Sequence, residues 1–547
     1  GQTDEVLSNS PGRTDEEGQR SSQNSVKRAC ALSPQILARI WRGFDRTLST
    51  DVTVVPKEPN FWGSFFRVSH TGPWDYLQRV PLVFYGPGRI VASQTPLREH
   101  VNLNDVYATV GEILDVELPQ RNAQVLQSAL VPDAAGTPKL VVVVMWDGVG
   151  RNVLERWPDR WPNLARLERE GTSYYEASVG SSPSVTPATH SSLGTGAFPR
   201  SHKMIAIDYR GADGEIHSAF ERSDPRQLKL TTFADEIDLI FGNDPKVGML
   251  AWSVSGSPPT GPDAWITNHL GMLGHGTATS GGDADQEALI GDTGNITANP
   301  RFYSLPRYLE DFKGLRRHAD ELDRADGEAD GRWMGHDILG AHQNPAWVNY
   351  QTDILTTMLT KSHYGDDDTP DLFFTNVKPS DTAGHAFTID SEEVAAVVEA
   401  QDAALGELVD YLDQEVGDYV LIMSSDHGHT GNPRQSGAWP VNPEELKRDL
   451  NNYFPVPEGR SIVQNMEAVG VYVNRDVANA IGVETRDVAN FLNSYTIRAN
   501  WPGEELPKAY AGRGQERVLS AAFTKSQFPR IMECAFGSKR PPPDLDA

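Results

Sequence analysis

Cysteine, positive charge and long apolar runs are all scarce in this chain of 547 residues, which has only Cys30 and Cys534. Two cysteines are too few for a disulfide-rich scaffold or for a zinc site built on thiolates. No run approaches 18 consecutive apolar residues, so no membrane span is expected. Only 49 Lys and Arg stand against 75 Asp and Glu, giving a formal net charge of -26. Because phosphate backbones attract Lys and Arg, this balance disfavours nucleic acid as a general partner.

The apolar fraction of 38% and the 12 Trp indicate a globular protein. Continuous apolar runs, typical of strands buried on both faces of a sheet, occur at 80–86, 140–147, 371–377 and 419–426. Helical patterns alternate with them at 152–171, 391–414 and 483–495. This alternation predicts a three-layer α/β fold, with a central mostly parallel sheet and helices on both faces. Ligands are then expected at the carboxyl ends of the strands.

Composition also suggests how the chain is divided. Polar, aliphatic-poor ends predict a disordered tail at 1–27 and a loose tail at 541–547. The stretch 121–138 is interpreted as a linker, because it ends in Gly-Thr-Pro. The catalytic core is expected at 139–204 and 366–540. The Gly-, Asp- and Ser-rich stretch 205–365 is expected to be an inserted cap that shapes the substrate site.

Acidic and histidine residues follow three of the buried runs. Asp147 ends the first of them, Asp381 and His385 follow the second, and Asp426 and His427 follow the third. Carboxylate oxygens and imidazole nitrogens together suit zinc. The pattern therefore predicts a metal site at one edge of the sheet.

A hydroxyl residue, Thr186, lies in the segment SSPSVTPATHSSLGTG, with Ser184 as the nearest competing hydroxyl. A Thr hydroxyl needs a base or a metal to become a nucleophile. The chain has no Ser-His-Asp elbow of the GxSxG type beside it, so activation by metal is the better interpretation.

The ordered set of motifs resembles the alkaline phosphatase superfamily, in particular its nucleotide pyrophosphatase/phosphodiesterase branch. That branch shows an Asp after the first strand, a Thr four residues before a His, then Asp-x-x-x-His, then Asp-His-Gly. The matching residues here are Asp147, Thr186 with His190, Asp381 with His385, and Asp426-His427-Gly428.

The family's last ligand is a His after the Asp-His motif, but here no His follows His429. A segment similar to the family's closing block instead lies near the start, at 69–90, and contains His70. The flanking segments 49–61 and 98–119 resemble the strand before that block and the terminal helix after it. The resemblance therefore implies a circularly permuted chain, in which 28–120 is the displaced C-terminal part of the catalytic domain.

In such a chain the new ends would lie close together, which leads us to expect a disulfide between Cys30 and Cys534. Bridging requires Cα atoms within about 7 Å. An acidic chain with such a disulfide slightly favours export over a cytoplasmic location.

The resemblance further implies two divalent metal ions, with Zn2+ preferred. One ion would be held by Asp147, Thr186, Asp426 and His427, and the other by Asp381, His385 and His70. Thr186 would form a phospho-threonine intermediate. His190, His202 and His429 are interpreted as packing residues or as partners of the ligands.

The expected substrate is a small phosphate ester. Monoesterases of the superfamily with a Thr nucleophile often carry a Lys-x-Arg pair that binds the extra phosphate charge, whereas the aligned positions here are Ser253 and Ser255. Thr189 replaces the Asn that precedes the His in the phosphodiesterase branch. These differences favour a phosphodiester or pyrophosphate substrate. The alternatives are a phosphomonoesterase and a non-catalytic binding protein that retains the fold; the oligomeric state is not predicted.

Overall fold

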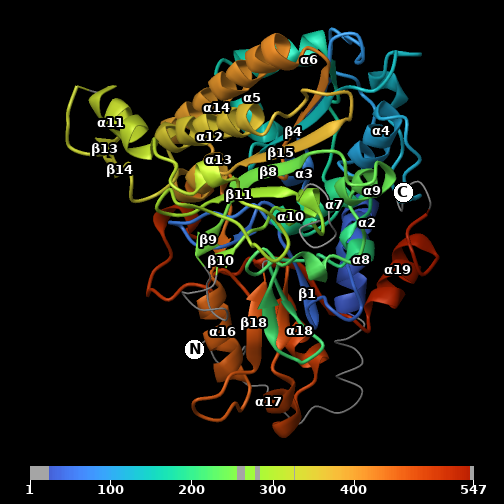
Figure 1. Ribbon diagram of the computed structural model, residues 1–547. Helices are drawn as coiled ribbons and strands as arrows, with labels where there is room; N and C mark the ends of the chain where they lie inside the picture. The colour runs from blue at the N-terminus through green and yellow to red at the C-terminus, as the bar shows by residue number, and fades with distance from the viewer. Residues whose placement is uncertain (1–23, 256–264, 277–283, 326, 468, 543–547) are drawn as a thin grey trace.

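The computed structural model describes residues 24–255, 265–276, 284–325, 327–467 and 469–542 (Figure 1). Its centre is an eight-stranded sheet in the order β12-β11-β8-β15-β4-β16-β3-β5. The inner strands run parallel: β11 (Gln286–Ile290), β8 (Val247–Trp252), β15 (Asp371–Val377), β4 (Leu140–Trp146) and β16 (Tyr419–Ser424). Antiparallel strands complete the edges: β12 (Ile296–Thr297), β3 (Leu82–Tyr85) and β5 (Thr172–Ser173). The predicted mostly parallel sheet is confirmed.

Helices cover both faces of this sheet, as the sequence of β4 requires. Its side chains alternate between the faces, so Val142 and Val144 join one core while Val141 and Val143 join the other. The first core is closed by α5 (Arg151–Arg156), α6 (Pro162–Glu170), α12 (Pro345–Lys361) and α14 (Glu392–Tyr411). The second is closed by α4 (Asp105–Ile113), α7 (Thr186–Thr195), α9 (Phe233–Ile240) and α10 (Leu270–Leu273). The three-layer α/β fold is confirmed.

The helical pattern predicted over 152–171 is interrupted in the structure. It forms α5 and α6 with a break at Trp157 and Pro158. A proline inside a helix lacks the N–H for an internal hydrogen bond, whereas Pro162 fits the first turn of the second helix.

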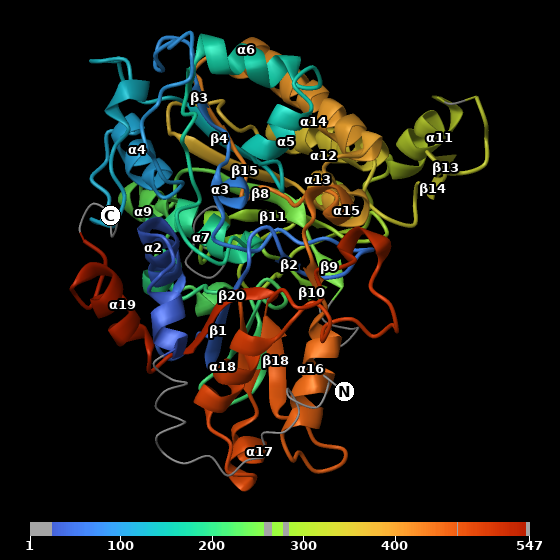
Figure 2. The same cartoon turned by 180° about the vertical axis from the view of Figure 1, so that it is seen from behind.

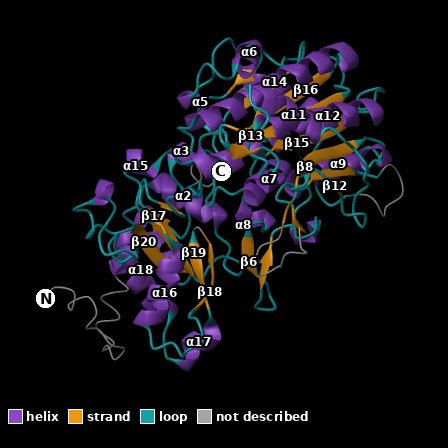
Figure 3. Ribbon diagram, turned by 90° about the vertical axis from the view of Figure 1, so that its left-hand side faces the viewer, coloured by secondary structure: helices purple, strands orange, loops and turns teal. Residues whose placement is uncertain are grey.

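A second sheet forms a separate lobe below the first (Figure 3). Its antiparallel order is β18 (Val463–Glu467), β19 (Gly470–Val473), β1 (Val52–Pro56) and β20 (Leu519–Thr524). The helices α16 (Pro443–Tyr453), α17 (Arg475–Ala480) and α18 (Thr485–Ser494) accompany it. The lobe thus joins the 49–61 segment, through β1, to the last hundred residues of the chain.

Both ends of the described chain meet at this lobe. The helices α2 (Pro34–Gly43) and α19 (Phe528–Phe536) lie side by side in both views (Figures 1 and 2). The predicted disulfide is confirmed: Cys30 and Cys534 are bonded, with Cα atoms 5.8 Å apart. The tail prediction needs one correction, because residues 24–27 belong to a helix over 24–29 that packs through Val26 and Ala29. The rest of that tail, and 543–547, lie outside the described residues.

The stretch 205–365 contributes more than a cap, since β8 and β11 are inner strands of the central sheet. The remaining elements are β2 (Phe61–Trp62), α3 (Asp75–Gln78), α8 (Pro199–His202), β6 (Asp208–Arg210), β7 (Ile216–Ser218), β9 (Val254–Ser255), β10 (Trp265–Ile266), α11 (Leu315–Ala325), β13 (Arg332–Trp333), β14 (His336–Asp337), α13 (Pro379–Phe387), α15 (Pro433–Ser436), β17 (Pro440–Val441) and short helical turns. Among the residues that the structure describes, we find no helix with the length and apolar character needed to cross a bilayer.

Candidate metal centre

Three adjacent parallel strands carry the acidic and histidine motifs. Asp147 follows the last residue of β4, and Asp426 follows β16 after one intervening serine. Asp381 lies in the first turn of α13, which begins two residues after β15 ends. Because the order is β15-β4-β16, their carboxyl ends meet at one edge of the sheet.

The first group of potential ligands is formed by Asp147, Asp426 and His427, which are all fully buried. Nε2 of His427 lies 3.6 Å from Oδ1 of Asp147 and 3.2 Å from Oδ2 of Asp426. The backbone N–H of Gly148 donates to Oδ1 of Asp426 over 3.0 Å, which fixes that carboxylate.

The second group is built around Asp381. Its Oδ1 lies 3.5 Å from Nε2 of His70 and 3.5 Å from Nε2 of His385. The ring of His70 also stacks on that of His427, with centroids 3.4 Å apart. The structure therefore brings His70, from the amino-terminal part of the chain, between the two groups.

Hydrogen bonds to backbone carbonyls orient three of the imidazoles. Nδ1 of His70 faces the carbonyl oxygen of Ser184 at 3.2 Å. Nδ1 of His385 faces that of Val68 at 2.5 Å, and Nδ1 of His427 faces that of Gly428 at 3.0 Å. A carbonyl oxygen only accepts, so each Nδ1 carries the proton and each Nε2 is left to bind a cation. This support of the outer ring nitrogen is typical of metal-binding histidines.

His429 has the opposite arrangement. The backbone N–H of Thr430 donates to its Nδ1 over 3.0 Å, so the proton of the neutral ring is on Nε2. That Nε2 faces Oδ1 of Asp381 at 3.6 Å. His429 could complete a group with Asp381 and His385, but its proton position favours a donor that supports Asp381.

The chemistry of these residues fits divalent metal ions. Within the described part of the chain, Oδ1 of Asp381, Oδ2 of Asp426 and Nε2 of His427 are buried without a partner in hydrogen-bond geometry. Burial and the Asp426 carboxylate raise the pKa of Asp147 to about 8. Burial opposes a charge on His427, but Asp426 outweighs it and raises the pKa of His427 to about 9. Binding of a cation here is therefore coupled to release of protons.

Sequence reasoning missed Asn376 and Lys378, which flank the end of β15. The amide of Asn376 donates to Oδ2 of Asp147 over 3.1 Å and lies 3.4 Å from Nε2 of His269. The ring of His269 in turn contacts that of His190, with Nδ1 atoms 3.1 Å apart. Asn376 and Lys378 border a buried run just before the Asp381 motif, but that position alone does not distinguish them from ordinary polar residues at the end of a strand.

Thr186 is the first residue of α7, with a side chain that is 3% exposed. The segment before it is tied to the centre, since the Ser184 hydroxyl donates to the carbonyl oxygen of His70 over 3.2 Å. Helix α7 packs so closely on α10 that a Cβ at Gly194 would lie 1.9 Å from the carbonyl oxygen of Gly271. This contact explains the run of small residues in α7.

The other predicted substrate-side residues lie near this edge. Thr189 is buried in α7, and its hydroxyl is among the buried polar atoms without a hydrogen-bond partner in the described part of the chain. Ser253 follows the carboxyl end of β8 and is buried, with its N–H bonded to the carbonyl of Ile290. Ser255 belongs to β9, but its side chain lies outside those described.

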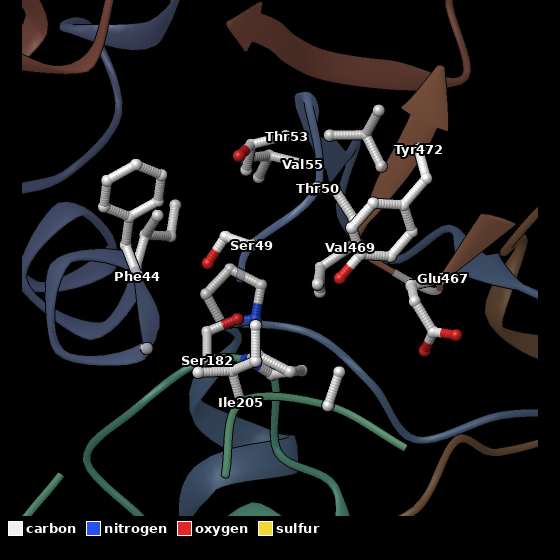
Figure 4. Close-up of a pocket in the computed structure, with 16 residues that line it drawn as sticks. Phe44, Ser49, Thr50, Thr53, Val55, Ser182, Ile205, Glu467, Val469 and Tyr472 are labelled. Carbon is white, nitrogen blue, oxygen red and sulfur yellow. The ribbon is translucent and has the colours of Figure 1, made fainter. Parts of the chain in front are cut away.

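A separate shallow hollow, open to solvent, is bordered by Ser182 and Pro183 of the turn that leads to Thr186. In Figure 4, Phe44 lies across it from Glu467 and Tyr472, and Ser182 borders it. None of the predicted metal ligands lines this hollow, so it is distinct from the metal centre.

Comparisons with known proteins show what the whole chain is similar to. The chain is 22% identical over 425 residues to alkaline phosphatase PafA of Elizabethkingia meningoseptica, covering 66% of this chain and 73% of the relative. It is 22% identical over 415 residues to a protein of Myroides odoratus named calcium-transporting ATPase, covering 66% and 74%. Alkaline phosphatase PhoV of Synechococcus elongatus is 22% identical over 364 residues, covering 57% and 63%.

The crystal structure of wild-type PafA has a similar fold, with a TM-score of 0.51 at 18% identity, covering 72% of this chain and 85% of that one. The family model for type I phosphodiesterase/nucleotide pyrophosphatase matches residues 141–519. The chain therefore belongs to the type I phosphodiesterase/nucleotide pyrophosphatase family and is a phosphoric ester hydrolase of the alkaline phosphatase superfamily.

Proposed function

We propose that this protein hydrolyses phosphodiester or pyrophosphate bonds of small molecules, with Thr186 as nucleophile and two divalent metal ions as cofactors. The observation that carries the proposal is the convergence of His70 on Asp381, His385 and His427, beside Asp147 and Asp426. We propose zinc because the donors combine imidazole nitrogen and carboxylate oxygen.

Asp147, Asp426 and His427, together with Thr186, would hold one ion, and Asp381, His385 and His70 the other. When bound, the ions supply positive charge that favours ionisation of the Thr hydroxyl and stabilises negative charge on the phosphate. The positive end of the α7 helix dipole adds a favourable field for an anion beside Thr186.

Oγ1 of Thr186 gives its proton to solvent and attacks phosphorus opposite the leaving oxygen. The bond from phosphorus to that oxygen breaks, and the oxygen departs with the cleaved group and takes up a proton from solvent where its basicity requires one. The product is a phospho-threonine ester. Water then attacks the same phosphorus, releases the phosphate product and restores the Thr hydroxyl. The chain's own contribution is to orient the imidazoles through Nδ1 and to exclude bulk water from a buried centre.

The preference for a diester rests on Ser253, which stands where a cationic residue would bind a second phosphate charge. A phosphomonoesterase is the second candidate, favoured by the names of the relatives PafA and PhoV.

The test compares initial rates on bis-p-nitrophenyl phosphate and p-nitrophenyl phosphate, before and after chelation and with zinc restored. We expect faster turnover of the diester, loss of activity on chelation and its recovery with zinc. Thr186→Ala should lower kcat by roughly 10³-fold or more. Thr195→Ala, at the far end of the same helix, removes the same two groups, a methyl group and a hydroxyl that here is bonded to the Ser191 carbonyl, and serves as control. Activity that survives Thr186→Ala would refute the assigned nucleophile.

We also propose that the chain is circularly permuted. In support, the segment 49–119 supplies β1 and β3 to the two sheets and His70 to the centre, while the family model begins only at residue 141. A rearranged chain with 28–120 placed after residue 540 should fold and hydrolyse the same esters. Failure of that chain to fold would count against the proposal.

We further propose that the protein is exported, on the basis of the Cys30–Cys534 disulfide. Cell fractionation tests this, and a protein confined to the cytosol with free thiols would contradict it.

A further inference from the structure

A lysine ammonium group lies inside the cluster of metal-binding side chains. Nζ of Lys378 is 3.2 Å from Oδ1 and 3.1 Å from Oδ2 of Asp147, and 2.7 Å from Oδ2 of Asp381. Its side chain is 14% exposed, so this charge is largely removed from water. Lys378 thus bridges one carboxylate from each predicted metal site.

The ammonium group contacts the two carboxylates differently. Oδ1 of Asp381 faces the imidazoles of His70 and His385, whereas Oδ2 binds Lys378. Both oxygens of Asp147 contact Lys378, while Oδ2 also accepts from the Asn376 amide and Oδ1 also faces the imidazole of His427. Lys378 can therefore keep its contact with Asp381 when a cation binds on the imidazole side, whereas at Asp147 it shares Oδ1 with that side.

No other fixed positive charge in the described residues balances the centre. Among them, Lys378 is the only Lys or Arg with a nitrogen within 4.0 Å of Asp147, Asp381 or Asp426. Two buried carboxylates lie within 3.2 Å of its ammonium group, and an opposite charge at this distance favours the charged form of a lysine.

The contacts of Lys378 stabilise the metal-free protein and destabilise the metal-bound protein. Without metal, the ammonium group offsets repulsion among buried carboxylates. With metal, it places a like charge within a few ångströms of any ion that the same carboxylates bind. Asp147 keeps the Asn376 amide and the Asp381 carboxylate keeps its imidazole neighbours if Lys378 is replaced, so loss of charge should outweigh loss of orientation.

Building on the two-metal function proposed above, we propose that Lys378 is a built-in counter-ion that stabilises the metal-free centre and weakens divalent binding at both sites. It is a positioning residue that acts through Asp147 and Asp381. Its charge thus sets the metal concentration at which the enzyme becomes loaded.

The test uses the full chain stripped with a chelator, titrated with Zn2+ by calorimetry and unfolded thermally with and without Zn2+. Lys378→Met should bind Zn2+ at least tenfold tighter, unfold at a lower temperature when stripped, and gain more from added Zn2+ than the natural protein. Lys378→Arg, which keeps the charge, should resemble the natural protein. If Lys378→Met does not fold, the neutral but polar Lys378→Gln replaces it, with the same expectations.

Lys246 offers a matched control at the opposite end of β15. Its Nζ lies 3.4 Å from the buried carboxylate of Asp371 and 3.2 Å from the exposed carboxylate of Asp367. Lys246→Met should lower the unfolding temperature equally with and without Zn2+, and leave Zn2+ affinity unchanged.

Unchanged or weaker Zn2+ binding by Lys378→Met would overturn the proposal, as would identical behaviour of the Arg and Met variants. Hydrolysis by the natural protein is measured separately on the same preparations. If Lys378→Met binds Zn2+ more tightly than the natural protein but the natural protein cleaves no phosphate ester, only the proposed function is refuted. If the natural protein binds no Zn2+, the proposed function and the proposed role of Lys378 are both refuted.

Discussion

Gly150 provides the sharpest test of how the centre is assembled, because two ligand-bearing loops cross at this residue. A Cβ added there would lie 2.4 Å from Cα of Gly428, 2.8 Å from its nitrogen and 2.9 Å from the carbonyl oxygen of Arg79. Non-bonded carbon atoms normally approach to about 3.5–4.0 Å. The backbone of Gly150 has φ -66° and ψ 174°, which alanine adopts freely, so the whole cost of Gly150→Ala comes from crowding.

To relieve this contact the two loops must separate by about 1 Å. Gly428 directly follows His427, so the movement displaces a potential ligand relative to Asp147 on the other loop. A misplacement of this size costs roughly 10²-fold in rate, and overpacking costs about 1–3 kcal/mol of stability. We therefore expect kcat/KM of Gly150→Ala to fall about 10²-fold.

The assay combines diester hydrolysis, zinc content by mass spectrometry and thermal unfolding. Gly459→Ala is the control, because a Cβ there meets no atom within 4 Å and adds only the strain of a φ of +75°. Normal kcat/KM and zinc content in Gly150→Ala would show that the loops can part without disturbing the centre, and the reasoning from crowding would be wrong.

Three further predictions concern a ligand, the disulfide and a buried carboxyl. His70→Ala should bind one zinc ion instead of two, and its metal affinity should fall by more than the roughly 10–100-fold cost of losing a residue that supports a ligand. Replacement of the buried His202 should change neither zinc content nor affinity. Full zinc content in His70→Ala would contradict this prediction. Replacement of both Cys30 and Cys534 by serine should lower the free energy of unfolding by about 2–4 kcal/mol, because the disulfide joins residues separated by 504 positions. An unchanged midpoint of urea unfolding would contradict this prediction. Burial raises the pKa of Glu287 from 4.5 to about 8, so the folded state holds a proton that the unfolded state releases over this window. Its contribution to stability is complete below pH 4.5 and falls by roughly 1.4 kcal/mol per pH unit up to about pH 8, and Glu287→Gln should remove this fall in pH-dependent denaturation curves.

The central sheet and most of the centre could be predicted because local sequence and tertiary structure agree there. Runs such as 140–147 are apolar at every position, and each is followed by residues that suit a metal. His70 was accessible only through a resemblance to a segment usually found at the other end of such chains. The potential ligands that surround it, Asp381, His385 and His427, are more than 300 positions away in sequence, and no local pattern indicates that they lie close.

Other parts could not be predicted for identifiable reasons. Strand β18 is half-buried over most of its length, so it lacks the continuous apolar run that revealed β4. In the sequence, Lys378 cannot be distinguished from an ordinary polar residue after a strand, because its role depends on two carboxylates that only the fold brings together. The position of the His429 proton likewise depends on one backbone N–H, that of Thr430, which sequence does not place.

The position of β1 has a consequence for the order in which the protein can be completed during synthesis. Val52–Pro56 lies between β19 and β20, and its pairing partners extend to residue 524. A ribosome makes β1 about 400 residues before β19 and β20, so the strand has no pairing partner over that length of synthesis. The lobe that holds β1 can therefore be completed only after these later strands have been made, although the segment that carries His70 is made soon after β1.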